Sequence, residues 1–347
     1  MRRGFVRCSA AAVLFGISAP LASRLAGDLS AFSLAGLLYL GAAVFVAPLV
    51  GRSRPSRREV RRGLPRLATA VVLGGAVAPV LLAAGLQRTP AATASLLLNL
   101  ELAFTTLLAL FVFREHLGRR VIAGSGLVAL AGATLGWSGS AEIRGGAAFI
   151  AGACLCWALD NCLTATLDVL TPAQITFAKG VVAGSANLVI GLVSGRMPSG
   201  WPVLGALVVG ALGYGASITL WVAGARELGA ARGQLVFATA PFVGAVVSWT
   251  FLAEPVAGRE LVAVAIALIG VSFVLHSDHE HDHAHAAVEH DHEHVHDDAH
   301  HDHVHGPADR LPDSGRHQHV HVHGAVAHRH PHLPDIHHRH GHEQANA

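Results

Sequence analysis

Residues 85–137 read GLQRTPAATASLLLNLELAFTTLLALFVFREHLGRRVIAGSGLVALAGATLGW, two long apolar segments around a short charged break, Arg-Glu-His at 114–116. Residues 224–275 repeat this pattern 139 positions later and end in QLVFATAPFVGAVVSWTFLAEPVAGRELVAVAIALIGVSFVL. A repeat of fixed period indicates two halves of one architecture. The matched residues are Ala91-Ala92 with Ala230-Ala231, Glu115 with Glu254, and Arg120 with Arg259.

The composition is that of a membrane protein. The chain has 347 residues, of which 52% are hydrophobic and 14% charged, whereas soluble domains carry about 25% charged residues. Residues 8–276 form apolar segments of about 20 residues, the length that spans a hydrocarbon core. The net charge of +2 averages two unlike regions, and nucleic acid is not an expected partner. We interpret the four cysteines as small packing residues.

The apolar pattern predicts an all-α polytopic membrane protein with ten transmembrane helices as two inverted five-helix repeats. The first repeat covers residues 1–137, the second covers 138–276, and a tail covers 277–347. Because five spans per repeat is an odd number, the two halves must face the membrane in opposite directions, which is the plan of many secondary transporters. A duplicated scaffold without transport is the alternative. The expected spans are 8–26, 31–50, 67–86, 91–113, 119–137, 146–167, 173–193, 203–223, 231–252 and 259–276.

Arginines decide the expected orientation. With the N-terminus inside, the cytoplasmic side receives 15 of them before the tail, seven of these in the loop 51–66, and the outer side receives five. Short loops rich in Lys and Arg stay cytoplasmic. We therefore expect a multi-pass protein of the cell inner membrane with both termini in the cytoplasm. The basic and then apolar start of the chain fits a secretory signal as well as this first span.

Two segments, NLELAFTTLLALFVFREHLGRR and FATAPFVGAVVSWTFLAEPVAGRE, resemble the signature hairpins of EamA-type members of the drug/metabolite transporter superfamily. The segment GACLCWALDNCLTATLDVLTPAQITFAKG resembles the start of the second such domain. The resemblance covers residues 8–276. It implies ten helices around a central cavity and alternating access, usually in an exporter that uses no ATP.

The chain departs from the family pattern at three positions. Arg114 and Ala253 stand where the family commonly has glycine before the loop glutamate, and Leu102 stands where it commonly has proline. The second half keeps that proline as Pro241. The missing proline puts a kink near Leu102 in doubt, although it leaves the fold unchanged.

Glu101 lies near the middle of the span 91–113, where a charged side chain costs roughly 2.5–3.5 kcal/mol on insertion scales. The matching residue of the second half is Ala240, so the fold alone does not require this acid. We expect Glu101 to face the bundle interior, where it binds a cation or carries the proton that drives transport. The alternative is a buried neutral acid with a hydrogen bond.

Asp160 and Lys179 lie on consecutive antiparallel spans at a similar depth, roughly 10 Å into the membrane at about 1.5 Å per residue. They can therefore form a hydrogen-bonded ion pair, which lowers the cost of each charge. The functional interpretation is a wall of the transport path, or a gate that opens when substrate competes for the pair; the alternative is a structural salt bridge. Polar residues expected on the same faces are Asn161, Thr164 and Asn187.

Two other patterns have local meanings. Gly180 and Gly184 form a small-xxx-small motif and predict close helix contact. Glu115 and Glu254 sit at breaks between spans, where each is expected to begin the following helix because acids suit a helix N-terminus. No nucleophile–base set, phosphate loop or HExxH motif stands out, so an enzyme is not expected.

The tail from 277 to 347 contains 23 histidines, 13 Asp or Glu and four arginines. With little to bury, it is expected to be disordered without a ligand. Neutral imidazoles with carboxylates suit Zn, Ni, Co or Cu, and no cofactor is expected for transport itself. A solvated or pH-responsive tail is the alternative. The candidate ligands are His279, His281, His283, His285, His290, His292, His294, His296, His300, His301, His303 and His305.

Three functions remain open at this point. We expect a secondary active exporter of a small organic metabolite or drug, with a metal-binding regulatory tail. The alternatives are an efflux transporter for Ni, Co or Zn, and a membrane-anchored metal store or sensor without flux. The interior of the spans lacks histidine, and their oxygen ligands suit hard cations better than Ni or Zn, so the organic solute is preferred. Expected partners are the lipid bilayer, a small-molecule or metal-ion substrate, and a possible second copy in a homodimer.

Overall fold

The computed structural model describes two compact units, one within Met1–Ser277 and one within Asp278–Ala347. The described residues are 2–51, 57–112, 118–137, 140–164, 167, 170–195, 199–228, 233, 236–275, 279–285, 288–294, 317–323 and 326–332.

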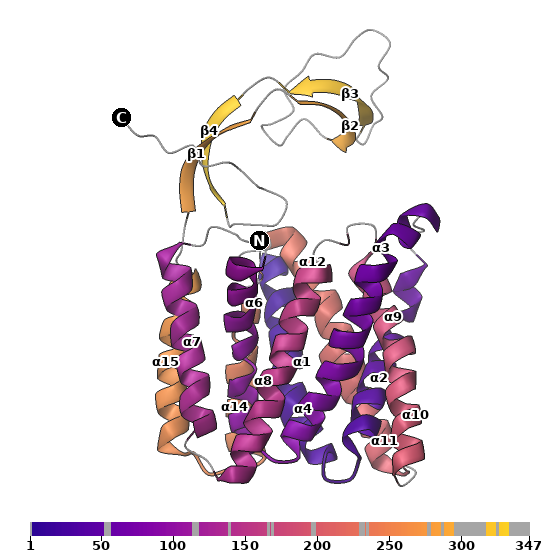
Figure 1. Cartoon of the computed structure of the whole chain (residues 1–347), viewed down its shortest axis with the longest axis vertical. Helices are drawn as coiled ribbons and strands as arrows, with labels where there is room; N and C mark the ends of the chain where they lie inside the picture. Colours follow the sequence, from indigo (N-terminus) through magenta and orange to yellow (C-terminus); the bar gives the residue numbers. More distant parts are fainter. Residues whose placement is uncertain are drawn as a thin grey trace. The chain divides into compact units, whose positions relative to one another are not determined.

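The first unit is a bundle of helices that run side by side (Figure 1). In chain order the helices are α1 (Arg2–Leu25), α2 (Ala31–Val50), α3 (Arg57–Ala70), η1 (Val71–Val77), α4 (Ala78–Leu86), α5 (Ala91–Leu97), α6 (Leu100–Phe111), α7 (Arg119–Trp137), α8 (Ala141–Thr164), α9 (Pro172–Ala178), η2 (Lys179–Gly184), α10 (Ser185–Ser194), α11 (Trp201–Val209), η3 (Gly210–Ala216), α12 (Ser217–Leu228), α14 (Ala240–Phe251) and α15 (Gly258–Leu275). The segments η1, η2 and η3 are π-helices that continue directly from the α-helices around them.

Eight helical stretches among the described residues are long and apolar enough to cross a membrane. The ninth and tenth expected spans contain α14, which has 12 helical residues, and α15, which has 18. The chain is therefore a multi-pass helical membrane protein, and the count of ten spans stays a prediction. The eight stretches are Arg2–Leu25, Ala31–Val50, Gly63–Leu86, Ala91–Phe111, Arg119–Trp137, Ala141–Thr164, Pro172–Ser194 and Trp201–Ala225.

The helix boundaries reproduce the sequence repeat. Moving α1 forward by 139 positions gives 141–164, the bounds of α8, and moving η1 gives 210–216, the bounds of η3. The packing exchanges in the same way, because α1 lies against α12 and α14 as α8 lies against α4 and α6. The two halves are thus copies of one helical plan in three dimensions as well as in sequence.

The fourth and ninth spans each contain a tightened turn, and the two turns differ by one residue in position once the offset of 139 is applied. Between α5 and α6 the Asn99 amide donates to the Leu96 carbonyl, and before α14 the Thr239 amide donates to the Val236 carbonyl, in each case over 3.2 Å and three residues. These tightened turns replace the α-helical pattern. The missing proline at Leu102 therefore does not remove the break, because this turn forms it without one.

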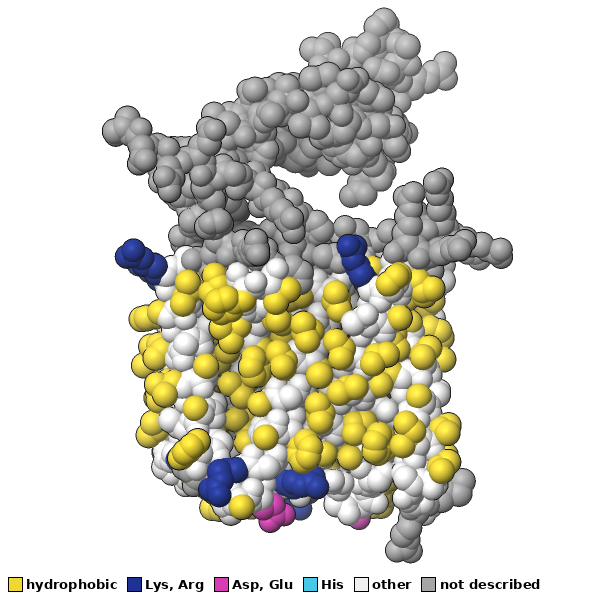
Figure 2. Space-filling view, viewed as in Figure 1, with side chains coloured by type: hydrophobic (Ala, Val, Ile, Leu, Met, Phe, Trp, Pro, Cys, Tyr) yellow, Lys and Arg dark blue, Asp and Glu magenta, His cyan; other side chains and the backbone are white. Residues whose placement is uncertain are grey.

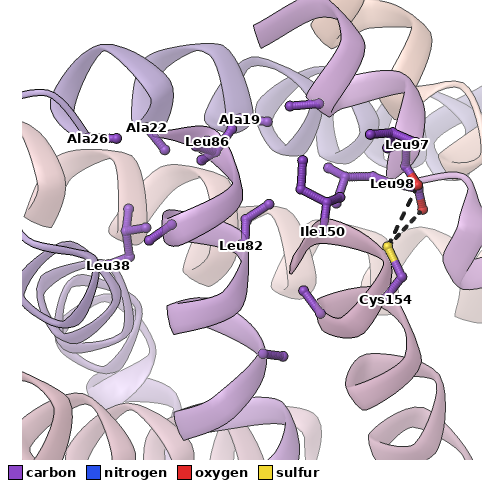
Figure 3. Packing of buried hydrophobic residues seen from close by; sticks show 14 of the residues in the cluster. Ala19, Ala22, Ala26, Leu38, Leu82, Leu86, Leu97, Leu98, Ile150 and Cys154 are labelled. Atoms are coloured by element: carbon purple, nitrogen blue, oxygen red, sulfur yellow. Dashed lines mark hydrogen bonds between the residues drawn. The ribbon is translucent and has the colours of Figure 1, made fainter. Parts of the chain in front are cut away.

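The core is built from small and branched side chains. Ala19, Ala22 and Leu82 pack in it together with Ile150, and the Cys154 thiol donates to the Leu97 carbonyl at the break (3.7 Å; Figure 3). All four cysteines are free. Small residues let membrane helices approach closely.

Such close contact is seen at Gly180, where a Cβ atom would overlap the carbonyl oxygen of Tyr39. The small-residue motif at Gly180 and Gly184 thus packs η2 against α2, as predicted.

Apolar side chains also cover the outside of the bundle. In Figure 2 they spread over the middle of the visible face, and Lys and Arg side chains lie toward its two ends. Val44 is 72% exposed and Phe111 71%. Exposure of such apolar side chains on the outside of a span is expected where lipid replaces water.

The described part of the second unit consists of β1 (His279–His285), β2 (Val288–His294), β3 (His317–His323) and β4 (Val326–His332). β1 pairs antiparallel with β4, and β2 with β3. The composition predicted a tail that is disordered without a ligand, and this stays a prediction. The register places His281 opposite His330 and His292 opposite His319.

Candidate functional site

The candidate site is centred on α8, which packs against α6 and against the π-helix η1, and η1 in turn packs against the π-helix η2. A π-helix leaves local backbone groups to find partners outside its own ladder, and such segments are frequent at functional sites. Here the Gly74 carbonyl of η1 accepts from the Tyr39 hydroxyl (2.6 Å) and from Trp157 Nε1 (3.1 Å). The Ala76 carbonyl accepts from Asn187 Nδ2 (3.1 Å). Side chains from α2, α8 and α10 therefore hold η1 in place.

Asp160 and Lys179 form a buried ion pair beside η1. Lys179 Nζ lies 2.5 Å from Asp160 Oδ2, and the two side chains are only 12% and 4% exposed. The pairing that the sequence allowed is thus present. Asp160 Oδ1 is buried and has no hydrogen-bond partner among the described residues. The pair therefore keeps one unused acceptor inside the bundle.

Gly74 makes room for this pair. A Cβ atom at Gly74 would overlap the Asp160 carboxylate, so any larger residue there would displace it. Gly75 is similarly close to the Lys179 side chain, with its Cβ position 3.2 Å from Lys179 Cβ. The two glycines let η1 approach both charges, and this is why the ion pair fits against a helix backbone.

Glu101 and Asn161 form the second polar contact. Asn161 Nδ2 donates to Glu101 Oε1 over 2.6 Å. Glu101 lies in the first turn of α6, directly after the break, where the helix N-terminus stabilises a negative charge. Asn161 follows Asp160 on α8, so the two polar contacts start from adjacent residues of one helix. Glu101 is partly exposed and Asn161 is exposed, whereas Asp160 is buried.

The other two predicted residues have different surroundings. Asn187 is buried against η1, as described above, but the Thr164 hydroxyl donates to the Asp160 carbonyl of its own helix (2.9 Å). The described hydrogen bonds of the Thr164 hydroxyl therefore go to backbone carbonyls of its own helix, those of Asp160 and Asn161.

Sequence reasoning missed Tyr39, Trp157 and Gly74. A signal existed for the tyrosine, because the chain has only two and both lie inside apolar spans. Trp157 is 8% exposed in the middle of a span, whereas Trp137 is 86% exposed at a helix end, where indoles are common. The role of Gly74 depends on the approach of another helix and has no signature in the sequence.

The prediction for Glu254 was wrong. Its two carboxylate oxygens accept from the amides of Ala91 and Ala92 at the start of α5, each over 2.8 Å, and not from the following helix. Glu260 begins the following helix instead, because its carboxylate accepts from the amide of Ala257 (3.2 Å), the residue before α15. This contact is half of a capping box, in which the acid at the third helical position accepts from the backbone amide of the residue that precedes the helix. Glu115 lies outside the described residues.

Metal ligation has no described geometry. Within the described ranges, no three His, Cys, Asp or Glu side chains come together in a group that could hold a metal ion. Seven of the predicted histidine ligands are residues of strands β1 and β2, namely His279, His281, His283, His285, His290, His292 and His294. Those outside the described residues are His296, His300, His301, His303 and His305.

Comparison with known proteins matches both halves of the bundle to the model of the EamA-like transporter family, over residues 3–136 and 144–276. A relative described as an uncharacterized transporter, from Methanothermobacter thermautotrophicus, is 29% identical over 304 residues, which are 80% of this chain and 87% of the relative. A solved structure, described only as the crystal structure of a protein, has a TM-score of 0.57 at 17% identity. That match covers 79% of this chain and 98% of the solved one, and it supports the fold alone.

Proposed function

Because this chain belongs to the EamA-like transporter family, we propose that it is a secondary active exporter of a small organic metabolite or drug. The observation that carries the proposal is the cluster of Glu101, Asn161, Asp160 and Lys179 at the helix break and π-helices. Broken helices with polar groups inside the membrane are where secondary transporters bind substrates and coupling ions. Alternating access of the two halves around this cluster would move the cargo.

Glu101 is the proposed coupling residue. Its described hydrogen-bond partner is the neutral amide of Asn161, whereas Asp160 has the ammonium group of Lys179. The charge of Asp160 is therefore balanced within the protein, and that of Glu101 is left for a proton or a cationic group of the cargo. Ionisable residues inside membranes commonly carry out this task. Asn161 orients the carboxylate by its hydrogen bond.

The Asp160–Lys179 pair is the proposed gate of the same site. A buried pair satisfies both charges, and breaking it without replacement is costly. A polar cargo that binds either partner would replace the lost contact, so opening would depend on cargo. The free Oδ1 of Asp160 offers such a cargo a first acceptor.

Flux into sealed vesicles tests the proposal. The full chain is reconstituted, and uptake of amino acids, organic amines, Zn, Ni and Co is followed under an imposed pH gradient. We expect an organic solute to move with protons in the unmodified protein and not in Glu101→Gln. Movement of a metal ion that also needs Glu101 would establish metal efflux instead. A protein that moves no solute would fit a store or sensor.

The orientation is a separate proposal, with both termini in the cytoplasm of a cell with an inner membrane. Four glycines offer matched reporters, because a Cβ at each meets no atom within 4 Å. We expect Gly51→Cys and Gly118→Cys to react with an impermeant maleimide only from the cytoplasmic side. Gly145→Cys and Gly258→Cys should react only from outside. The reverse pattern would invert the topology.

Regulation by metal is proposed for the histidine-rich segment. Alternating histidines and carboxylates are suited to Zn, Ni, Co or Cu. Calorimetric titration of the full chain with Zn should show binding that is lost after replacement of the histidines of 279–305 by glutamine. If Zn also changes the flux of the organic solute in the unmodified chain only, the segment is regulatory. Unchanged flux at saturating Zn would leave it without that role.

A further inference from the structure

Glu254 connects the two halves of the bundle. It lies between α14 and α15 in the second half, and both of its carboxylate oxygens accept from backbone amides of the first half, those of Ala91 and Ala92 (2.8 Å each). Hydrogen bonds from amides to a charged carboxylate are stronger than neutral ones, and the start of a helix adds its dipole. This is a two-point attachment between segments 162 residues apart.

Glu260 adds a second attachment at the same place. It is 3% exposed, and it accepts from the hydroxyl of Thr93 on α5 (2.6 Å) and from Trp249 Nε1 on α14 (3.1 Å). Thr93 is itself fully buried. The first three residues of α5 are therefore all held by carboxylates of the second half. We call these contacts of Glu254 and Glu260 with residues 91–93 the clasp.

The loop that presents Glu254 is strained. Ala253 has a φ of 53°, in the left-handed region where glycine is at ease and alanine is not. Ala253 lies just after the C-terminal end of α14. The backbone amide of the next residue, Glu254, donates to the Ser248 carbonyl over 3.2 Å. Arg24 of α1 also reaches this loop, with Nη2 3.3 Å from the Leu252 carbonyl. Strain of this kind persists where surrounding contacts hold it, as the clasp does here.

The other end of α5 leads into the candidate site. α5 runs from the clasp to the break at 98–99, and Glu101 follows in the first turn of α6. At the break the Cys154 thiol contacts the Leu97 and Leu98 carbonyls. A displacement of the α5 N-terminus would therefore be transmitted along the seven residues of this helix, about two turns, to the break beside Glu101.

We propose that Glu254 and Glu260 are positioning residues that keep the transporter closed at the end where α5 begins. The clasp opens when the candidate site becomes accessible to solvent and cargo from that end. The inference rests on the proposed alternating access. It gives the strained loop a purpose, because release of the clasp would also release the strain at Ala253. A static helix cap, with no part in opening, is the competing explanation.

Thiol labelling separates the two explanations without any transported solute. Ser95→Cys is the reporter, since Ser95 lies in α5 and is 1% exposed. The full chain in vesicles reacts with a membrane-permeant maleimide, which reaches both faces of the bilayer, and labelling of each cysteine is read by peptide mass spectrometry. Native Cys8, fully buried on α1, reports global unfolding in the same sample. Glu142→Gln, at an exposed acid in the first turn of α8, is the matched control.

With Glu254→Gln we expect the reporter to react roughly tenfold faster or more, because charge-assisted bonds are lost, while Cys8 stays protected. Glu142→Gln should leave both rates unchanged. An unchanged reporter rate in Glu254→Gln, or a parallel rise at Cys8, would show that Glu254 is only a structural cap. Either outcome leaves the exporter proposal intact, because that proposal depends on flux through Glu101.

A second variant tests the strain. Ala253→Gly keeps the clasp and removes the conformational penalty from the closed state, so the reporter should react more slowly, by roughly fivefold for about 1 kcal/mol of relief. Faster labelling in Ala253→Gly would contradict the proposal that the closed clasp holds a strained loop.

Discussion

The first and second halves of the bundle share a helical plan but differ in their buried charges. At an offset of 139 positions, Glu101 corresponds to Ala240, Asp160 to Leu21, and Lys179 to Leu40. In all three cases one copy has an ionisable residue and the other an apolar one. The helical plan therefore forms with an apolar residue at each of these positions. The ionisable residues, each present in one half only, are not required by the fold, and a functional role explains them.

The π-helices show the same difference. η1 and η3 occupy equivalent positions, so they belong to the shared plan. η2, at 179–184, corresponds to 40–45, which is ordinary α-helix within α2. It begins at Lys179, the one lysine of the chain. The second half, which has the charge of Lys179, thus also has the π-helix at this position. The comparison of the halves places the buried charges that lack a counterpart on η2, α6 and α8.

The largest effect should come from moving the acid between the halves. Glu101→Gln should reduce coupled flux to the rate of protein-free vesicles, and the exchange Glu101→Ala with Ala240→Glu should not restore it, because Asn161 is present beside one copy only. Flux under a pH gradient is the measurement, with Glu142→Gln as the control. Restored flux in the exchanged protein would mean that the halves are chemically equivalent.

The next effect concerns the ion pair. Asp160→Asn leaves the Lys179 charge buried without a partner and should lower the free energy of unfolding by roughly 3–5 kcal/mol. The double change Asp160→Asn with Lys179→Met should be less destabilised than the single one, since it leaves no charge. Thermal unfolding in detergent checks both. If the two variants are equally destabilised, the pair does not stabilise this half.

Two equivalent glycines give a smaller, direct comparison. Gly74→Ala would push a methyl group into the Asp160 carboxylate, whereas Gly213→Ala in the second half would meet the short side chain of Ser18. Overpacking costs about 1–3 kcal/mol. We expect Gly74→Ala to reduce flux more than Gly213→Ala does at similar losses in melting temperature. Equal flux in the two would remove the distinction between the halves at this position.

The smallest effect is expected at Tyr39→Phe, which removes one hydrogen bond to the Gly74 carbonyl. That carbonyl keeps Trp157 Nε1 as a donor, so the loss should be about 1 kcal/mol. A fall of about 2–4 °C in the melting temperature would correspond to it. A fall several times larger would show that the hydroxyl holds more of η1 than this contact.

The sequence predicted the repeat, the helical membrane class and five of the residues now seen in or next to the polar cluster. The repeat and the class were predictable because apolar periodicity is a local signal, and the polar residues stood out because a charge inside a span is costly. The role of these polar residues in transport stays a prediction. It also located Asp160 and Lys179 at one depth, since depth follows from counting residues along two connected helices.

Contacts between distant segments were not accessible in the same way. Glu254 was expected to begin the following helix because that helix is its neighbour in sequence, yet it binds the amides of Ala91 and Ala92 in the other half. The break at Leu98–Asn99 forms without a proline, the residue that would have indicated it in the sequence.

The amino-acid sequence by itself determined the membrane class, the two homologous halves and the choice of charged residues, because hydrophobic burial acts along each segment. Only the tertiary structure decided which carbonyls of η1 are held by Tyr39 and Trp157, and why Gly74 must be small. It also decided which half provides the carboxylates that hold α5. These features depend on packing between helices, where angstrom-scale fit selects the partner and no local pattern records it.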